Sequence, residues 1–391
     1  MLRRVPSALT TRAAQQLQAL EAKALLRRPP SITDRRGVEY RLGGQAVVGF
    51  CSNDYLGLST RQTQTSRLAG AGASRLISGD LPIHRALEQR IAAVCGSDDT
   101  VLFPSGFQLN VGVIPALVSP GDNVFSDRLN HASIIDGLRL ARSSPTVLPH
   151  GAAPPPRAAE DNAGDIDWWF TESIFSMDGD RFDATAMIQH QKSGGSAYVD
   201  DAHAFGLFPG GAGLVHDAAI LPDVLVGTLS KAYGCAGAFV AATRPICDLI
   251  RNRARSFVFS TGVSPSVASD IAAHLDIVTS GEGDALRARL WRNVQQLGGL
   301  LPGPSPCPAE PPSPIFPVVI GSNSAALDVA ARLLQQGFHV QAIRPPTVPT
   351  GTARLRVTVS AAHTSEQIQS LAHELRRALA CHGERATIVA S

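Results

Sequence analysis

The sequence predicts an α/β protein with a mostly parallel sheet flanked by helices and a smaller α+β domain at the C-terminal end. The first observation is that short apolar runs, typical of buried strands, alternate with helical stretches through residues 46–283. The second is a Pro-rich stretch at 301–314, which follows a long helical segment. The third is the length of 391 residues, which exceeds what one hydrophobic core usually organises.

The N-terminal residues 1–45 are expected to form an arm made of a helix and a hairpin. Apolar residues recur at helical spacing in the first 28 residues (Leu17, Leu20, Ala24 and Leu25), and Pro29-Pro30 should end that helix. This start is also rich in arginine and poor in acids, which is typical of an organellar transit peptide. We favour the structural helix. Residues 38–50 alternate and read as a hairpin.

Residues 46–283 are expected to form the large ligand-binding domain. Its expected elements are helices at 81–94 and 106–117 and strands at 100–103, 123–126, 168–172, 197–200, 224–227 and 238–241. The segment 152–164 reads as a solvated surface connection. Residues 284–391 are expected to form the small domain, with helices at 284–300, at 325–336 and from 365, and strands at 315–319, 339–343 and 354–359.

Composition excludes several classes of function. The formal net charge is +2 and no stripe of Lys and Arg is present, which argues against a nucleic-acid partner. No apolar stretch approaches the roughly 20 residues that span a bilayer. The cysteines lack the spacing of a metal site or a disulfide framework (Cys51, Cys95, Cys235, Cys247, Cys307 and Cys381). Reduced thiols in a cytoplasmic enzyme are therefore expected.

Lys231 is the first candidate catalytic residue. Lysine is scarce in this chain, with only Lys23, Lys192 and Lys231 present. Lys231 alone follows an apolar strand, in the segment V-L-V-G-T-L-S-K. Partial burial there would lower its pKa and supply a neutral amine that attacks carbonyl carbons. A surface lysine at a strand end is the alternative.

Acids and a histidine follow another expected strand, in Tyr198-Val199-Asp200-Asp201-Ala202-His203. The carboxyl edge of an open α/β sheet is where such folds bind ligands. An acid at that edge can keep a heteroaromatic nitrogen protonated, and pyridoxal 5′-phosphate (PLP) needs such a partner because its ring acts as the electron sink. A metal site is the alternative, but the rest of the chain offers no convincing further ligands, so no metal is expected.

Two further candidates follow strands. Phe103-Pro104-Ser105-Gly106-Phe107 is a junction between a strand and a helix, where free backbone N–H groups favour an anion. His131 follows the next expected strand, although a lone histidine is more often structural. A single ligand explains the whole set, with phosphate on the turn, the ring against His131, an acid on its nitrogen and its aldehyde on Lys231.

Nearly the whole chain resembles the α-oxoamine synthases, which are PLP enzymes of fold type I, the aspartate-aminotransferase-like fold. The matching motifs are C-S-N-D-Y-L-G-L at 51–58, S-R-L-I-S-G-D-L-P-I-H at 74–84, S-G-F-Q-L-N at 105–110, S-D-R-L-N-H-A-S at 126–133, E-S-I-F-S-M-D-G-D at 172–180, V-D-D-A-H at 199–203 and T-L-S-K at 228–231. Within the family, Ala342–Thr358 most resembles members that condense L-alanine with a pimeloyl thioester in biotin synthesis. Relatives that use glycine, serine or another acyl thioester remain the alternative.

The resemblance implies roles toward PLP for these residues of this chain. Lys231 would hold the cofactor as a Schiff base and act as catalytic base, Asp200 would face the ring nitrogen, and His203 would contact the phenolic oxygen. His131 would stack on the ring, and Ser176 would lie near the ring's oxygen. The phosphate contacts would come from Gly106, Phe107 and Thr228, and from Ser260 and Thr261 of a second subunit.

The resemblance also implies substrate contacts and partners. Asn53 and Arg356 are candidates for binding the amino-acid carboxylate, with Arg354 a weaker one. Arg27 or Arg28, together with Thr347, would hold the acyl substrate. A homodimer with shared active sites is implied. The chain departs from the frequent G-x-G after D-D-A-H, since it has Ala204-Phe205-Gly206, and this predicts extra bulk beside the cofactor.

Two rival functions from other classes have little support. A transcription factor with an aminotransferase-like domain would need an additional DNA-binding domain before the first family motif, and only about 45 residues precede that motif here. A non-catalytic partner subunit of a heterodimer would lack the Schiff-base lysine, whereas Lys231 is present.

Overall fold

The computed structural model describes residues 8–63, 68–156, 165–301, 313–380 and 387–388. Residues 157–164 of the expected surface connection, 302–312 of the Pro-rich stretch, and Cys307 and Cys381 lie outside the described residues. Among the described helices, none is long and apolar enough to cross a membrane.

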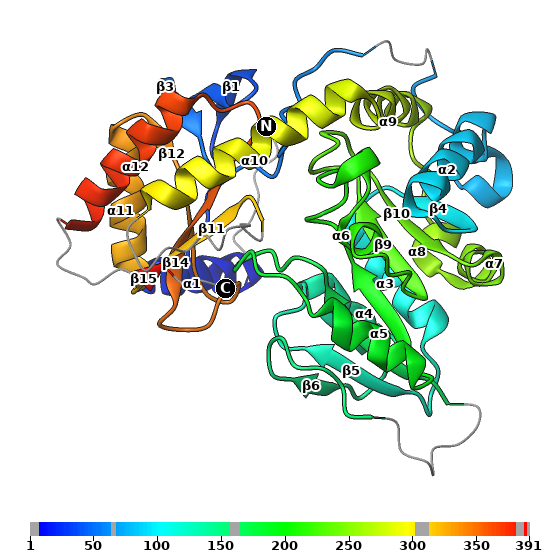
Figure 1. The fold of residues 1–391 in the computed structure, drawn as a ribbon. Coiled ribbons are helices and arrows are strands. Elements are labelled where there is room, and N and C mark those ends of the chain that lie inside the picture. Colours follow the sequence, from blue (N-terminus) through cyan, green and yellow to red (C-terminus); the bar gives the residue numbers. More distant parts are fainter. Residues whose placement is uncertain (1–7, 64–67, 157–164, 302–312, 381–386, 389–391) are drawn as a thin grey trace.

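The largest sheet has seven strands in the order β4-β10-β9-β8-β7-β5-β6 (Figure 1). Their bounds are β4 Asp99–Phe103, β5 Asn123–Asp127, β6 Thr146–Leu148, β7 Asp167–Glu172, β8 Ser196–Asp200, β9 Val224–Thr228 and β10 Ala238–Ala242. The strands β6, β5, β7, β8 and β9 run parallel, while β10 is antiparallel to both of its neighbours. The mostly parallel sheet flanked by helices is therefore confirmed.

Alternate residues of the strands β4, β10, β9, β8 and β7 enter two separate apolar cores, which is why these strands appear in the sequence as continuous apolar runs. On β4, Val101 packs into one core and Leu102 into the other. The helices around the sheet are α2 Pro82–Cys95, α3 Gly106–Leu117, α4 Ala132–Leu140, α5 Ala184–Lys192, α6 Leu214–Asp217, α7 Arg244–Arg253, α8 Arg255–Val258 and α9 Pro265–Val278. The segments α3, α4, α7 and α8 contribute to the core that contains Val101.

The long helix α10 (Gly281–Leu300) leads from α9 to the smaller part of the molecule (Figure 1). There a sheet in the order β13-β14-β11-β15 packs against α11, and α12 packs against α10 and α11. The bounds are β11 Ile315–Gly321, α11 Asn323–Gln335, β13 Gln341–Ile343, β14 Ala353–Thr358, α12 Ser365–Ala380 and β15 Thr387–Ile388. This smaller α+β part is the one that the sequence predicts.

A third sheet joins the N-terminal hairpin to the C-terminal part of the chain. Its order is β1-β2-β3-β12, with β1 Ile32–Arg36, β2 Glu39–Leu42, β3 Gln45–Gly49 and β12 Phe338–His339. The expected hairpin is confirmed, but β3 also pairs with β12, nearly 300 residues later. The expected strand at 339–343 is two short strands in different sheets, β12 and β13.

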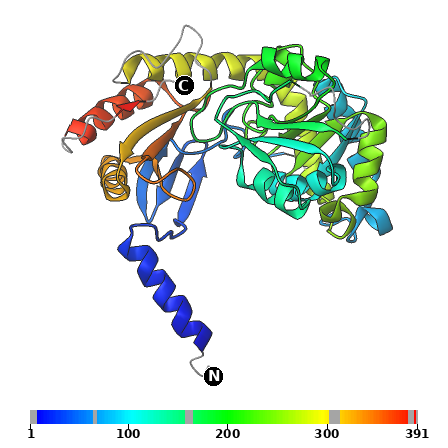
Figure 2. The same ribbon diagram turned by 90° about the horizontal axis from the view of Figure 1, so that it is seen from below.

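The N-terminal helix α1 spans Ala8–Ala22 and extends away from the rest of the chain (Figure 2). None of its residues is buried. The expectation that this helix continues to Pro29-Pro30 is wrong, because Ala24 has a left-handed backbone (φ 52°) that ends it earlier. Hydrogen bonds from Asn323 to the Lys23 carbonyl and from Arg344 to the Ala24 carbonyl fix the segment that follows.

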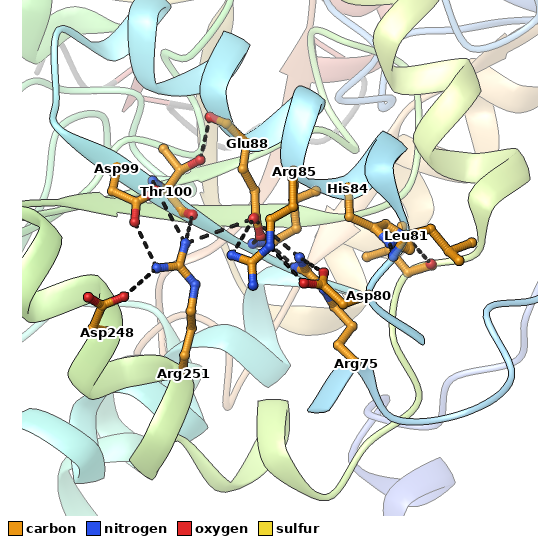
Figure 3. A network of polar contacts seen from close by, with 12 residues as sticks. Arg75, Asp80, Leu81, His84, Arg85, Glu88, Asp99, Thr100, Asp248 and Arg251 are labelled. Atoms are coloured by element: carbon orange, nitrogen blue, oxygen red, sulfur yellow. Dashed lines mark hydrogen bonds and ion pairs between the residues drawn. The ribbon is translucent and has the colours of Figure 1, made fainter. Parts of the chain in front are cut away.

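A buried network of ion pairs connects the π-helix η1 (Arg75–Gly79) to α2, β4 and α7 (Figure 3). Arg75 Nη1 lies 2.5 Å from Glu88 Oε1, and both side chains are only 2% exposed. Arg75 also binds Asp80. Arg251 binds Asp99 and lies 3.8 Å from Glu88. Glu88 additionally accepts a hydrogen bond from the Leu102 N–H, so its charge is compensated from several elements.

Candidate active site

A cavity of about 230 Å³ lies where the large sheet meets the smaller part of the molecule. It is lined by Cys51, Asn53, His131, Ser176, Met177, His203, Lys231, Gln341, Ile343 and Arg356. His131, Ser176, His203 and Lys231 follow the carboxyl ends of β5, β7, β8 and β9, while Gln341, Ile343 and Arg356 come from β13 and β14. The carboxyl edge of a parallel sheet is the place where an open α/β fold binds a ligand.

Lys231 enters this cavity from the turn that follows β9. The turn is closed by the Gly234 N–H, which donates to the Lys231 carbonyl at 2.9 Å. Burial lowers the pKa of Lys231 to about 8, while Asp200 and Glu172 act in the opposite direction. A larger fraction of neutral amine than an exposed lysine would have is therefore present near neutral pH.

Asp200 and His203 lie at the end of β8 and are buried. The carboxylate of Asp200 accepts hydrogen bonds from Asn110 Nδ2 at 3.0 Å and from the Ala202 N–H at 3.1 Å. Both donors are neutral, so no cationic group is hydrogen-bonded to this carboxylate. His203 Nδ1 lies 2.7 Å from the hydroxyl of Tyr55, and burial lowers the pKa of His203 well below its usual value.

His131 is the N-cap residue of α4 and lines the cavity beside the start of α3. Its backbone N–H donates to Glu172 Oε1 at 2.6 Å. Glu172 pairs with Asp200 across β7 and β8, and burial raises the pKa of Glu172 well above its usual value. The Phe107 ring meets the His131 ring edge-on at 6.4 Å, which places the first turn of α3 next to His131.

The structure distinguishes Arg356 from Arg354, although both lie on β14. Arg356 donates from Nε to the Ser176 carbonyl and from Nη1 to Asn53 Oδ1, at 2.5 and 2.9 Å. Its Nη2 is buried without a hydrogen-bond partner among the described residues. Arg354 instead forms an ion pair with Asp178. Arg356 therefore has a donor to spare for an anion in the cavity, whereas Arg354 is already neutralised.

The residues predicted to contact the phosphate do not line the cavity that Lys231 enters. Ser260 and Thr261 line a separate hollow with Gln108 and Gly237 rather than the cavity of Lys231. The Thr228 hydroxyl donates to the Gly237 carbonyl at 3.1 Å. Gly106 begins α3, and its α-carbon has open space where a side chain would point.

The candidates for acyl binding form a second group, outside the cavity. Arg27, Arg28 and Thr347 are all exposed. Arg27 donates to the Pro345 carbonyl at 3.3 Å, which ties it to the segment that carries Thr347. Arg28 pairs with Glu21 instead.

The prediction of extra bulk beside the cofactor from Ala204-Phe205-Gly206 is wrong. Neither Ala204 nor Phe205 lines the cavity. Phe205 is buried in the apolar core, where its ring stacks on Tyr233 and meets Phe239 edge-on. The Phe205 side chain therefore packs against Tyr233, in the turn that carries Lys231, and does not enter the cavity.

Sequence reasoning gave no role to Glu172, Tyr55 or Asn110, although all three contact predicted site residues. Each lies inside a motif that the sequence displays: Tyr55 in C-S-N-D-Y-L-G-L, Asn110 in S-G-F-Q-L-N and Glu172 at the end of an apolar run. A polar residue closing an apolar strand was the available signal for Glu172. No local signal pointed to Tyr55 or Asn110, because the partner of Tyr55 lies 148 residues away and the partner of Asn110 lies 90 residues away.

His150 holds together the two loops that carry His131 and Ser176. Its Nδ1 lies 3.0 Å from Asp127 Oδ1, and its Nε2 lies 2.7 Å from Asp180 Oδ2. Hydrogen bonds with both carboxylates raise the pKa of His150 to about 10. The imidazolium therefore bridges two acids at neutral pH. No group of three or more His, Cys, Asp or Glu residues that could hold a metal occurs in the described part of the chain.

Comparisons with known proteins agree with this geometry. Residues 45–375 match the family model "Aminotransferase class I and II". The chain is 38% identical over 379 residues to an 8-amino-7-oxononanoate synthase of Herminiimonas arsenicoxydans, covering 93% of this chain and 98% of the relative. It is 41% identical over 377 residues to the enzyme of the same name from Anaeromyxobacter dehalogenans strain 2CP-1, covering 90% and 92%.

Two solved structures share the fold. A serine palmitoyltransferase from Sphingomonas wittichii superposes with a TM-score of 0.81 at 25% identity, covering 97% of this chain and 99% of that one. An 8-amino-7-oxononanoate synthase from Francisella tularensis superposes with a TM-score of 0.68 at 22% identity, covering 86% and 99%. The chain therefore belongs to the class I and II aminotransferase family, in its branch of α-oxoamine synthases.

Proposed function

We propose that this protein is a PLP-dependent acyltransferase that condenses L-alanine with a pimeloyl thioester, with loss of carbon dioxide, to give 8-amino-7-oxononanoate for biotin synthesis. The observation that carries the proposal is the convergence of Lys231, His203, His131 and Arg356 around one cavity, with Asp200 near enough to interact electrostatically with the Lys231 amine. The relatives that bear this enzyme's name match nearly the whole chain.

The residues at the cavity fit PLP. Lys231 has an amine for the aldehyde, and Asp200 has a carboxylate bound only by neutral donors, which suits a protonated ring nitrogen. His131 would cover the ring, and His203 and Ser176 would face its oxygen. The first turn of α3 supplies the Gly106 and Phe107 N–H groups for the phosphate, because the first N–H groups of a helix have no partner within it.

PLP supplies an electron sink that stabilises negative charge on the substrate carbon. Asp200 would keep the ring nitrogen protonated, since its carboxylate accepts hydrogen bonds only from neutral donors. The Nζ amine of Lys231 would accept the proton from the α-carbon of L-alanine, and its lowered pKa suits a general base. The α-carbon would then bond to the thioester carbonyl carbon as the thiolate leaves, the resulting β-keto acid would lose carbon dioxide, and Lys231 would return its proton to that carbon.

Arg356 is the proposed partner of the L-alanine carboxylate. Its Nε and Nη1 are held by Ser176 and Asn53, while its Nη2 is left for the substrate. A planar guanidinium held in this way fixes the orientation of a carboxylate. On the acyl side, Arg27 is favoured over Arg28, because Arg27 contacts the Pro345 carbonyl next to Thr347. Arg354 is not favoured, since Asp178 neutralises it.

A homodimer with shared sites is the proposed assembly. Four large apolar side chains are exposed around Ser260 and Thr261, namely Leu76, Ile77, Phe107 and Phe259, and Ile77 is 84% exposed. Their segments adjoin, because Ser74 Oγ donates to the Val258 carbonyl and Ser256 Oγ donates to the Gln108 carbonyl. A second copy covering this surface would bring its Ser260 and Thr261 to the phosphate of the first.

The dimer proposal is tested by sedimentation and by complementation. Ile77→Asp should give a monomer in sedimentation velocity, while Ile32→Asp, at an exposed apolar residue elsewhere, should not. Mixed and reassociated subunits of Lys231→Ala and Thr261→Arg should regain activity that neither variant has alone. Activity that never returns in demonstrated heterodimers would contradict the shared site.

Two further parts of the proposal concern domains and location. We propose that residues 1–45 form the arm, 46–283 the PLP-binding domain and 284–391 the small domain. The pairing of β3 with β12 supports a close association of the arm with the small domain. The cytoplasm is the proposed location, in keeping with the free thiols of all four described cysteines.

The deciding experiment measures thiol release by the purified PLP-loaded protein with pimeloyl thioester and each of L-alanine, glycine and L-serine. We expect release with L-alanine and a product mass that matches 8-amino-7-oxononanoate. Lys231→Ala should abolish it, whereas Lys192→Ala, at an exposed lysine, should not. Release only with glycine or serine, or only with another acyl chain, would overturn the substrate assignment.

A further inference from the structure

A single buried amide connects Asp200, proposed to face the ring nitrogen of the cofactor, with His131, proposed to cover the ring face. Asn110 lies on α3 and is 1% exposed. Its Nδ2 lies 3.0 Å from Asp200 Oδ2 and 2.9 Å from Ser133 Oγ. Its Oδ1 lies 2.6 Å from the hydroxyl of Tyr198. The helices can approach this closely because α4 has Gly137 where a Cβ would lie 2.8 Å from the Asn110 carbonyl oxygen.

The direction of each hydrogen bond follows from what each atom can do. The carboxylate of Asp200 only accepts, so the amide nitrogen of Asn110 faces it. The amide oxygen then faces Tyr198, whose hydroxyl must donate. Ser133 Oγ accepts the second hydrogen of the Asn110 amide. The Ser133 hydroxyl hydrogen is then free to be donated to His131 Nδ1, which lies 2.7 Å from Ser133 Oγ.

A second donor fixes the protonation of His131. The backbone N–H of Ser133 points at the same His131 Nδ1, at 3.3 Å, and a peptide N–H cannot accept a hydrogen bond. Nδ1 must therefore be unprotonated, and the ring hydrogen lies on Nε2. Burial lowers the pKa of His131, which agrees with a neutral ring. Nε2 has no partner among the residues that the structure describes, and His131 lines the cavity.

We propose that Asn110 is a positioning residue that orients the Asp200 carboxylate and, through Ser133, holds His131 as the neutral tautomer with its hydrogen on Nε2. The role of this arrangement rests on the proposed function, because it concerns the two residues that would face PLP. An uncharged His131 adds no positive charge next to the protonated ring, and its Nε2–H remains available to an oxygen of the substrate. The tautomer is set by the partner of the other ring nitrogen.

The first test observes the ring nitrogens of His131 by ¹⁵N NMR in the cofactor-free protein, with His131→Gln to assign the signal. We expect an unprotonated Nδ1 and a protonated Nε2 at neutral pH. Ser133→Ala removes the hydroxyl donor at 2.7 Å and keeps only the longer backbone N–H contact at 3.3 Å, so part of the population should move its hydrogen to Nδ1. A wild-type hydrogen on Nδ1, or an unchanged tautomer in Ser133→Ala, would overturn the proposal. This result does not depend on whether the enzyme makes the proposed product.

The second test follows the acid limb of kcat against pH. Asn110→Leu removes the amide donor and Tyr198→Phe releases it, so the Asp200 carboxylate loses a hydrogen bond and the acid limb should move upward by about one pH unit. The other titratable groups that interact with Asp200 are Glu172, His131, Lys231, Asp201 and Tyr198.

Controls separate positioning from packing in the second test. Tyr233→Phe removes another buried tyrosine hydroxyl, which donates to the Gly211 carbonyl, and it should leave the acid limb in place. Tyr198→Phe keeps the test available if Asn110→Leu fails to fold. An equal fall in kcat at every pH, with no movement of the limb in Tyr198→Phe, would show that the residues only fill space and would refute the proposal.

Discussion

Replacing Arg75 with methionine should destabilise the large sheet more than replacing its neighbour Arg85. The methionine side chain has a similar length but no charge, so Glu88 loses its nearest cation in a place where both side chains are 2% exposed (Figure 3). Breaking one partner of a buried ion pair typically costs about 3–5 kcal/mol. We expect the lower end, about 3 kcal/mol, because Glu88 keeps the Leu102 N–H and lies near Arg251.

Arg85→Met is the matched control. Arg85 contacts the same two acids, Asp80 and Glu88, but its side chain is 47% exposed. Exposed ion pairs contribute about 1 kcal/mol or less, because water screens them. Both variants lose one positive charge from the same network, so a difference between them reports burial rather than net charge.

The assay is urea unfolding of the cofactor-free protein at one fixed protein concentration, followed by tryptophan fluorescence. Trp168 and Trp169 lie on β7, so the signal reports mainly on the large sheet. We expect the midpoint of Arg75→Met to fall clearly below that of Arg85→Met, at an unchanged slope. Free energies of unfolding that agree within about 1 kcal/mol would refute the reasoning from burial.

Three other predictions concern the site. Because the folded pKa of His150 is raised to about 10, its stabilisation is complete below the unfolded value near 6.5 and is lost as pH rises toward 10. The melting difference between wild type and His150→Asn should shrink over that range; a constant difference, or the same trend in exposed His373→Asn, would contradict this. Gly234→Ala should destabilise more than Gly210→Ala in urea unfolding, because both glycines have positive φ but only at 234 does a Cβ meet backbone, at 2.5 Å from Ser59 N; equal losses would argue against it. Arg356→Lys should raise KM for L-alanine about tenfold or more with a smaller change in kcat, and an unchanged KM would remove Arg356 from carboxylate binding.

The sequence predicted most elements of the fold because their signals are local. The buried strands β7, β8 and β9 are apolar runs closed by polar residues, and such runs indicate strands without any knowledge of the partner. The end of α1 was misplaced because Pro29-Pro30 is a strong stop signal, whereas the backbone turn at Ala24 has no residue that requires it. The pairing of β3 with β12 is a tertiary event that periodicity cannot reveal.

The site was predictable in part for the same reason. Lys231 and Asp200 each follow an apolar strand, so position along the chain already brings them to one edge of the sheet. Arg354 and Arg356 are two residues apart and therefore lie on the same face of β14. The sequence alone could not tell which of the two is neutralised by an acid. The answer comes from Asp178 and Asn53, which approach from distant parts of the chain.

The contacts of Arg356 also limit how this protein can be recombined with its relatives. The arginine belongs to β14 in the C-terminal part, yet its orientation depends on Asn53 near the start of the chain and on the Ser176 carbonyl in the middle. A chimera that exchanges residues 284–391 alone would combine the arginine of one protein with the Asn53 and Ser176 segments of another. Exchanges of substrate preference should therefore preserve the orientation of the arginine best when the segments around Asn53 and Ser176 are exchanged together with residues 284–391.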